Sequence, residues 1–167
     1  MIIDKLKSAE VPERFWGRIT LPVKRLILDN QELITNFLEK SSNLAIQFTD
    51  KKSGNEKATE LAVAVFKIIL ENDLPIKVRL VYQFTPLLVN QIMDRQPITN
   101  IKNADIIIFD GFDIIDPYNA KLLTGLLGYR KNNGLKSIFI SYEELRKLAE
   151  KNIVLQGLLN NYFVIKF

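Results

Sequence analysis

Short apolar runs alternate along the chain with longer stretches in which apolar residues recur at helical spacing. Runs that are rich in branched and aromatic side chains are typical of strands. Such runs occupy residues 44–49, 77–84, 104–110, 136–141 and 162–167. The run 104–110 (ADIIIFD) does not alternate between apolar and polar residues, so we expect a strand that is buried on both faces.

The stretches between these runs predict helices. Apolar residues at helical spacing cover residues 56–71, 87–95, 117–130, 143–151 and 153–159. Pro86 and Pro117 suit the first turn of a helix. A further helical region covers residues 22–40, where Asp29 and Asn30 can end one helix and begin another.

Strands that alternate with helices predict a three-layer α/β domain built on a parallel sheet of about five strands. We expect the strand that ends at Asp110 to lie inside this sheet, with the strand 44–49 beside it. The 167 residues suffice for one compact domain with a sizeable core. Residues 1–22 show no sustained period and are predicted to form an arm over the domain, which covers residues 23–167.

The composition excludes several classes of site. The chain contains no cysteine and no histidine, which removes disulfides, zinc–thiolate sites and imidazole catalysis. No apolar run reaches the roughly 20 residues of a membrane-spanning helix, and the N-terminus lacks the layout of a secretory signal. We therefore expect a cytoplasmic protein without membrane contact. The formal net charge of +4 slightly favours an anionic partner, although such an excess is common on solvated surfaces.

Two strand ends carry residues at the positions of a phosphate site. In parallel α/β sheets, ligands bind at the carboxyl ends of the strands. The loop 50–59 (DKKSGNEKAT) joins the first strand to its helix, which is the place of a phosphate-binding loop. Asp110 ends the third strand, where the acid on the magnesium side of such a site stands. Together they indicate a nucleotide-binding ancestry.

Four stretches resemble the AAA+ helicase loaders of the DnaC and DnaI kind. They are residues 11–16 (VPERFW), 58–64 (ATELAVA), 104–110 (ADIIIFD) and 126–141 (LLGYRKNNGLKSIFIS). The last two are the more specific, because their spacing matches the family's Walker B strand, following helix and sensor strand. The resemblance spans about residues 11–167 and implies a P-loop-NTPase-like, AAA+-like fold and a role in DNA replication.

The loop departs from the phosphate-binding pattern G-x-x-x-x-G-K-[ST] in either register. If the family's threonine falls on Thr59, its lysine falls on Ala58 and the preceding glycine on Lys57. If Lys57 is the lysine instead, Glu56 replaces the glycine and Ala58 replaces the hydroxyl. Gly54 is the only glycine in the loop, which therefore lacks the glycines that let backbone N–H groups approach a phosphate.

Three further positions of the resemblance carry the wrong chemistry for ATP hydrolysis. Gly111 stands where the family has the acid that orients water, Tyr142 where it has the sensor asparagine, and Gly157 where it has an arginine. We therefore expect a pseudo-ATPase without catalytic residues, cofactor or metal. Asp110 is interpreted as a hydrogen-bonded remnant rather than as a metal ligand.

The resemblance implies a non-catalytic AAA+-like protein of DNA replication, a helicase loader or an accessory to one. Its partner would be a helicase, a loader or an initiator, and it would act through protein contacts and single-stranded DNA. The alternative is an adaptor or inhibitor of an active AAA+ partner that binds no nucleic acid. Full-length loaders carry a helicase-binding domain where this chain has a short arm, which leaves helicase binding open.

Cations and aromatic side chains supply the candidate contacts to such a partner. They are Arg14, Phe15, Trp16, Lys51, Lys52, Lys57, Tyr129 and Arg130. Each has a structural alternative. Phe15 and Trp16 would anchor the arm on the core, the lysines would be solvated, and Arg130 would cap its helix.

Overall fold

The computed structural model describes residues 2–40, 42–71, 78–112, 116–142, 144–145, 147, 150, 153–159 and 162–167. These residues form a five-stranded sheet in which neighbouring strands are parallel. The strands are β1 (Asn43–Gln47), β2 (Leu80–Phe84), β3 (Ile106–Asp110), β4 (Lys136–Ser141) and β5 (Tyr162–Lys166). Their order in the sheet is β2-β3-β4-β1-β5, so β3 lies inside the sheet as predicted.

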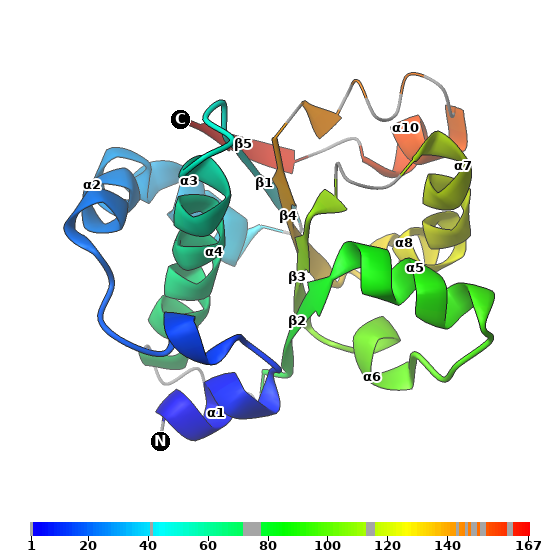
Figure 1. Cartoon of the computed structure of the whole chain (residues 1–167), viewed down its shortest axis with the longest axis horizontal. Coiled ribbons are helices and arrows are strands. Elements are labelled where there is room, and N and C mark those ends of the chain that lie inside the picture. The colour runs from blue at the N-terminus through cyan, green and yellow to red at the C-terminus, as the bar shows by residue number, and fades with distance from the viewer. Residues whose placement is uncertain are drawn as a thin grey trace.

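Helices cover both faces of the sheet, which Figure 1 shows between the two helical layers. One face carries α4 (Gly54–Glu71), α2 (Leu21–Asp29) and α3 (Gln31–Glu39). The other face carries α5 (Thr85–Met93), α6 (Thr99–Lys102), α7 (Pro117–Ala120), α8 (Thr124–Asn132) and α10 (Ile153–Leu158). The predicted three-layer α/β architecture is confirmed. Within the described part of the chain, no helix is long and apolar enough to span a membrane.

The central strand β3 shows why the sheet needs two helical layers. All of its residues are buried. Ile106 and Ile108 belong to the core on the α4 face, whereas Ile107 and Phe109 belong to the core on the α8 face. A strand that is apolar on both sides has to lie between two layers, which is what its uninterrupted apolar run predicts.

One predicted neighbour relationship is wrong, because β4 and not β1 lies beside β3. Ile138 of β4 is in register with Ile108 of β3 on one side and with Leu44 of β1 on the other. The second neighbour of β1 is β5. A helical crossover is long enough to pass over one strand, so strands that follow each other along the chain need not be neighbours in the sheet.

The helices follow the predicted pattern in most places. The helical region 22–40 breaks into α2 and α3, and the predicted helix 117–130 is divided into α7, the 3₁₀ turn η3 (Lys121–Leu123) and α8. The short helices α1 (Ile2–Ser8) and α6 are absent from the prediction, because so few residues show little periodicity. The predicted helix 143–151 falls largely outside the described residues.

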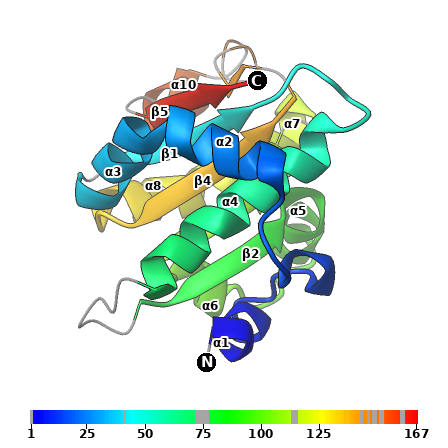
Figure 2. The same cartoon turned by 90° about the vertical axis from the view of Figure 1, so that its left-hand side faces the viewer.

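The arm packs into the core on the α4 face. Leu6 in α1 and Phe15 in the 3₁₀ turn η1 (Glu13–Phe15) are both buried. The Tyr82 N–H of β2 donates to the Ala9 carbonyl oxygen at 2.7 Å, which fixes the arm to the edge of the sheet. Figure 2 shows the arm running from α1, beside β2, to α2, which packs over α4.

Candidate functional site

The carboxyl ends of β1 and β3 bring polar residues to one edge of the sheet. In Figure 2 the strand arrows point to the edge at which α4 begins. β1 ends at Gln47, and a short loop leads from it to Gly54, the first residue of α4. β3 ends at Asp110. This edge is the one at which parallel α/β sheets bind their ligands.

Asp50 closes the loop between β1 and α4. Its carboxylate accepts the Lys52 N–H through Oδ1 at 3.0 Å and the Ser53 hydroxyl through Oδ2 at 2.6 Å. Its carbonyl oxygen accepts the Gly54 N–H at 2.8 Å. The Ser53 hydroxyl and the Lys52 N–H hold the pKa of the Asp50 carboxyl below its ordinary value. The Lys52 N–H and the Ser53 hydroxyl are therefore bonded to a carboxylate of the chain itself, and the Gly54 N–H to a carbonyl oxygen of the same residue.

Gly54 makes room for the buried ring of Phe48. A Cβ at Gly54 would lie 2.5 Å from Cδ2 and 2.9 Å from Cβ of Phe48. The Phe48 ring packs against that of Tyr142, with centroids 5.7 Å apart, and Lys51 Nζ lies 4.4 Å from the Tyr142 centroid. The glycine thus serves the packing of the loop against the chain's own aromatic side chains.

Asp110 is held by hydroxyl groups from two neighbouring elements. Its Oδ2 accepts the Thr59 hydroxyl of α4 at 3.0 Å and the Tyr82 hydroxyl of β2 at 2.5 Å. Asp110 is 4% exposed, and its Oδ1 is buried without a hydrogen-bond partner among the described residues. Burial and the charge of Asp110 raise the pKa of Tyr82 above its ordinary value, so the tyrosine stays protonated and donates.

The contact between Thr59 and Asp110 favours the first of the two registers of the loop. A threonine beside the acid of the third strand is the arrangement that a phosphate-binding pattern requires. In that register Ala58, which is fully buried, takes the place of the lysine. Gly111 has a φ of 67°, a left-handed conformation that suits glycine and would strain an acidic residue. Gly157, in α10, presents no side chain.

These residues do not fit a magnesium nucleotide. The Lys52 N–H and the Gly54 N–H are bonded to Asp50, whose negative charge would repel a phosphate. Ala58 offers no cation, and two hydroxyl groups already occupy Oδ2 of Asp110. No group of three or more His, Cys, Asp or Glu in the described ranges could hold a metal ion.

The three candidate lysines lie around the closed loop. Lys51 and Lys52 are exposed, and Lys57, in the first turn of α4, is half-buried. Lys57 is close enough to Asp50 for its charge to contribute to the lowered pKa of that carboxyl. The fold therefore brings these three cations together at the strand-end edge.

The arm residues lie against the α4 face, and two of them serve the core. Phe15 is 6% exposed, and Trp16 is half-buried with its Nε1 donating to the Val11 carbonyl oxygen at 2.7 Å. Phe15 is thus too buried to contact a partner, and the anchoring alternative describes it better. Arg14 is exposed, with its guanidinium carbon 4.8 Å from the Phe15 ring centroid, and remains available at the surface.

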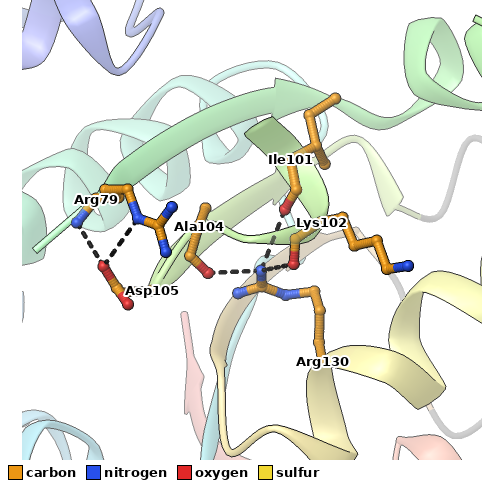
Figure 3. Close-up of polar contacts among 6 residues, drawn as sticks. All are labelled: Arg79, Ile101, Lys102, Ala104, Asp105 and Arg130. Atoms are coloured by element: carbon orange, nitrogen blue, oxygen red, sulfur yellow. Dashed lines mark hydrogen bonds and ion pairs between the residues drawn. The ribbon is translucent and has the colours of Figure 1, made fainter. Parts of the chain in front are cut away.

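Arg130 is buried and holds three segments of the chain together. Its guanidinium donates to the carbonyl oxygens of Ile101, Lys102, Ala104 and Lys136 and to the Ser137 hydroxyl. Figure 3 shows the first three of these bonds converging on the side chain. Arg130 is 1% exposed, and burial lowers its pKa to about 10. Its assignment as a partner contact is therefore wrong, because the side chain lies inside the domain.

Tyr129 lies beside Arg130 and faces α6 rather than the closed loop. Its hydroxyl donates to Asn103 Oδ1 at 3.0 Å, and Lys102 Nζ lies 4.2 Å from its ring centroid. The side chain is half-buried by these contacts. The fold therefore separates Tyr129 from the loop lysines and places it beside α6.

Sequence reasoning overlooks two residues that shape the site, Asp50 and Tyr82. Asp50 stands three residues before Ser53, a spacing typical of side-chain caps, so the sequence did contain a signal for the hydrogen bonds of Asp50. Tyr82 carries no such signal. Its contact with Asp110 exists because β2 lies beside β3, with Tyr82 in register with Ile108.

A cleft of about 940 Å³ lies between α1, β2 and α6. Its walls include Lys5, Arg79 and Asn103. Neither Asp50 nor Asp110 borders it, so the cleft is separate from the strand-end site. The geometry at the strand ends, and not the size of this cleft, locates the candidate site.

Comparison with known proteins finds similarity in structure and not in sequence. No protein-family model matches the chain, and a sequence search of curated proteins gives no match. The structure of the DnaC helicase loader matches with a TM-score of 0.64 and 20% identity, over 93% of this chain and 99% of that one.

Two further solved structures match at similar scores. A putative primosome component from Streptococcus pyogenes serotype M3 has a TM-score of 0.61 and 15% identity, over 98% of this chain and 94% of that one. DnaI has a TM-score of 0.61 and 12% identity, over 98% of this chain and 92% of that one. At these identities the likeness is one of fold. The chain therefore has the same fold as the DnaC helicase loader and DnaI, a three-layer α/β domain.

Proposed function

We propose that the chain is a non-catalytic AAA+-like protein of DNA replication, which acts as a helicase loader or as an accessory to one. Its fold matches the DnaC helicase loader over 99% of that chain. The match to a putative primosome component supports the same setting. The partner we propose is a helicase, a loader or an initiator, reached through protein contacts.

The closed loop is the observation that carries the non-catalytic part of the proposal. A bound triphosphate needs N–H donors, a lysine and a metal that together meet its charge. Here the Asp50 carboxylate takes the Lys52 N–H and the Ser53 hydroxyl, and buried Ala58 stands in the place of the lysine. We therefore expect the protein to act without ATP turnover, and binding to the partner to be independent of nucleotide.

The strand-end lysines support contact with single-stranded DNA. Lys51, Lys52 and Lys57 gather at one edge of the sheet, and the chain carries a net charge of +4. Cations in this arrangement attract phosphates and release counterions when they bind. Aromatic Tyr142 lies beneath Lys51 and offers a partly exposed ring beside them.

Two binding measurements test this proposal. The purified replicative helicase of the same organism is titrated with the protein in the presence and absence of ATP, and we expect equal affinities. Absence of any complex with helicase, loader or initiator would contradict the loader-like role.

The second measurement follows a labelled single strand as salt is raised. Replacing Lys51, Lys52 and Lys57 by alanine should reduce the slope of log affinity against log salt by about two, since each phosphate contact contributes about 0.7. Replacing the exposed Lys5, Lys7 and Lys24 is the matched control and should leave the slope unchanged. A protein that binds its partner but no DNA would fit the adaptor or inhibitor alternative instead.

A further inference from the structure

Tyr82 is the residue that completes the surroundings of Asp110. Its hydroxyl lies 2.5 Å from Asp110 Oδ2, the same oxygen that accepts the Thr59 hydroxyl at 3.0 Å. The Tyr82 ring packs against the core on the α4 face. Its hydroxyl therefore approaches Asp110 from the core side of the sheet edge. Two donors on one carboxylate oxygen use both of its lone pairs.

A cation on the metal side of a nucleotide site would draw on the Asp110 carboxylate, of which Oδ2 accepts both hydroxyls while Oδ1 is buried without a partner among the described residues. A hard cation beside the third strand would need carboxylate and hydroxyl oxygens with free lone pairs. Thr59 and Asp110 are both present, so the residues of the metal side survive better than those of the phosphate side. The difference from a metal site is Tyr82. Its hydroxyl donates a hydrogen bond to the carboxylate of Asp110, where a bound cation would instead contribute positive charge.

We infer that Tyr82 is a positioning residue that closes the metal side of the site, with its hydroxyl taking the place of a cation on Asp110. The Tyr82 hydroxyl then joins β2 to β3 at Oδ2 of Asp110, and the Thr59 hydroxyl joins α4 to the same oxygen. This inference rests on the proposed function, because it explains how the fold dispenses with Mg-ATP. The same residue fixes the arm, since the Tyr82 N–H donates to the Ala9 carbonyl oxygen at 2.7 Å.

The test compares thermal unfolding of the wild type, Tyr82→Phe and Tyr82→Phe/Asp110→Asn. Tyr82→Phe keeps the ring and removes only the hydroxyl, so the melting temperature should fall by about 3 to 8 °C. Tyr142→Phe is the matched control. Its hydroxyl lies at the same edge but has no hydrogen bond among the described residues, so its melting temperature should be unchanged.

Magnesium provides the readout that a purely structural role would not move. About 10 mM magnesium chloride, compared with potassium chloride of equal ionic strength, should recover about half of the loss in Tyr82→Phe. It should change neither the wild type nor the double variant, which lacks the carboxylate. An equal magnesium shift in the wild type, or none in Tyr82→Phe, would overturn the inference. Neither result depends on binding of helicase, DNA or ATP, so it is separable from the proposed function.

Discussion

Lys67 donates from Nζ to the carbonyl oxygen of Phe15 at 2.8 Å, which ties the arm to the middle of the domain across 52 positions of sequence. The same ammonium donates to the Gly17 carbonyl oxygen at 2.6 Å. Lys67 lies on α4 and is 8% exposed, and burial lowers its pKa below the ordinary value of 10.5. The arm is therefore held by a buried cation as well as by apolar contacts.

Replacing Lys67 by methionine should destabilise the protein by about 2 kcal/mol at neutral pH, because two carbonyl groups lose their donor. The loss should grow as pH rises. Between the lowered folded pKa and 10.5, the unfolded chain binds more protons at Lys67 than the folded one does, so wild-type stability gains with pH there. Urea unfolding at about pH 8, 9 and 10 measures this difference. A difference that shrinks with pH would contradict the burial of the ammonium.

Trp16 should act as an anchor of the arm. Trp16→Ala removes a half-buried ring and the bond to the Val11 carbonyl oxygen, and should cost about 2 kcal/mol. Trp16→Phe keeps most of the packing and should cost about half as much. Both values come from equilibrium unfolding in urea. Unchanged stability together with lost binding to a partner would show that Trp16 is a contact residue instead.

Gly54 should tolerate no side chain as long as Phe48 keeps its ring. Gly54→Ala places a Cβ 2.5 Å from Phe48 Cδ2 and should cost about 2 kcal/mol. Combining it with Phe48→Leu should recover part of that loss, because the smaller side chain leaves space for the methyl group. Gly125→Ala, where a Cβ would meet open space, is the control and should stabilise α8 by up to about 1 kcal/mol. Thermal unfolding of the wild type, Gly54→Ala, Phe48→Leu and the double variant shows whether the two losses simply add or whether the smaller side chain relieves the clash.

Arg130 should be among the most sensitive positions in the domain. Arg130→Met leaves several buried carbonyl oxygens without a donor and should cost about 3 kcal/mol or more. Arg79 is the control in the same region, as Figure 3 shows. Its side chain is 67% exposed and its Nε lies 3.7 Å from Asp105 Oδ2, so Arg79→Ala should cost less than about 1 kcal/mol. Equal losses in the two variants would refute the buried role of Arg130.

The layered fold was predictable because its signals are local. The uninterrupted apolar run of β3 requires two covering layers, and the helical spacing of α4 shows within its own residues. The position of β1 was not predictable in the same way. The neighbours of β1 in the sheet depend on how many strands each helical crossover passes over. The sequence of residues 43–47 contains no signal for that.

The site was predictable in its chemistry but only partly in its geometry. The departures at Ala58 and Gly111 from the expected phosphate-site residues are visible in the sequence once the loop and the third strand are aligned, and their effect on nucleotide binding stays a prediction. The exposure of each candidate side chain could not be predicted, because it depends on how the helices pack. Arg130 and an exposed arginine look alike in the sequence, and only the packing of α6 against α8 shows that its guanidinium lies inside.

Calorimetric titration of the purified protein with ATP and magnesium at physiological salt measures whether the strand-end site binds nucleotide. We expect at most weak, salt-sensitive binding through Lys51, Lys52 and Lys57, and no release of phosphate. The reason is that the Asp50 carboxylate accepts the Lys52 N–H and the Ser53 hydroxyl, and that buried Ala58 stands in the place of the lysine. A dissociation constant in the low micromolar range, or turnover that Asp110→Asn abolishes, would contradict this expectation.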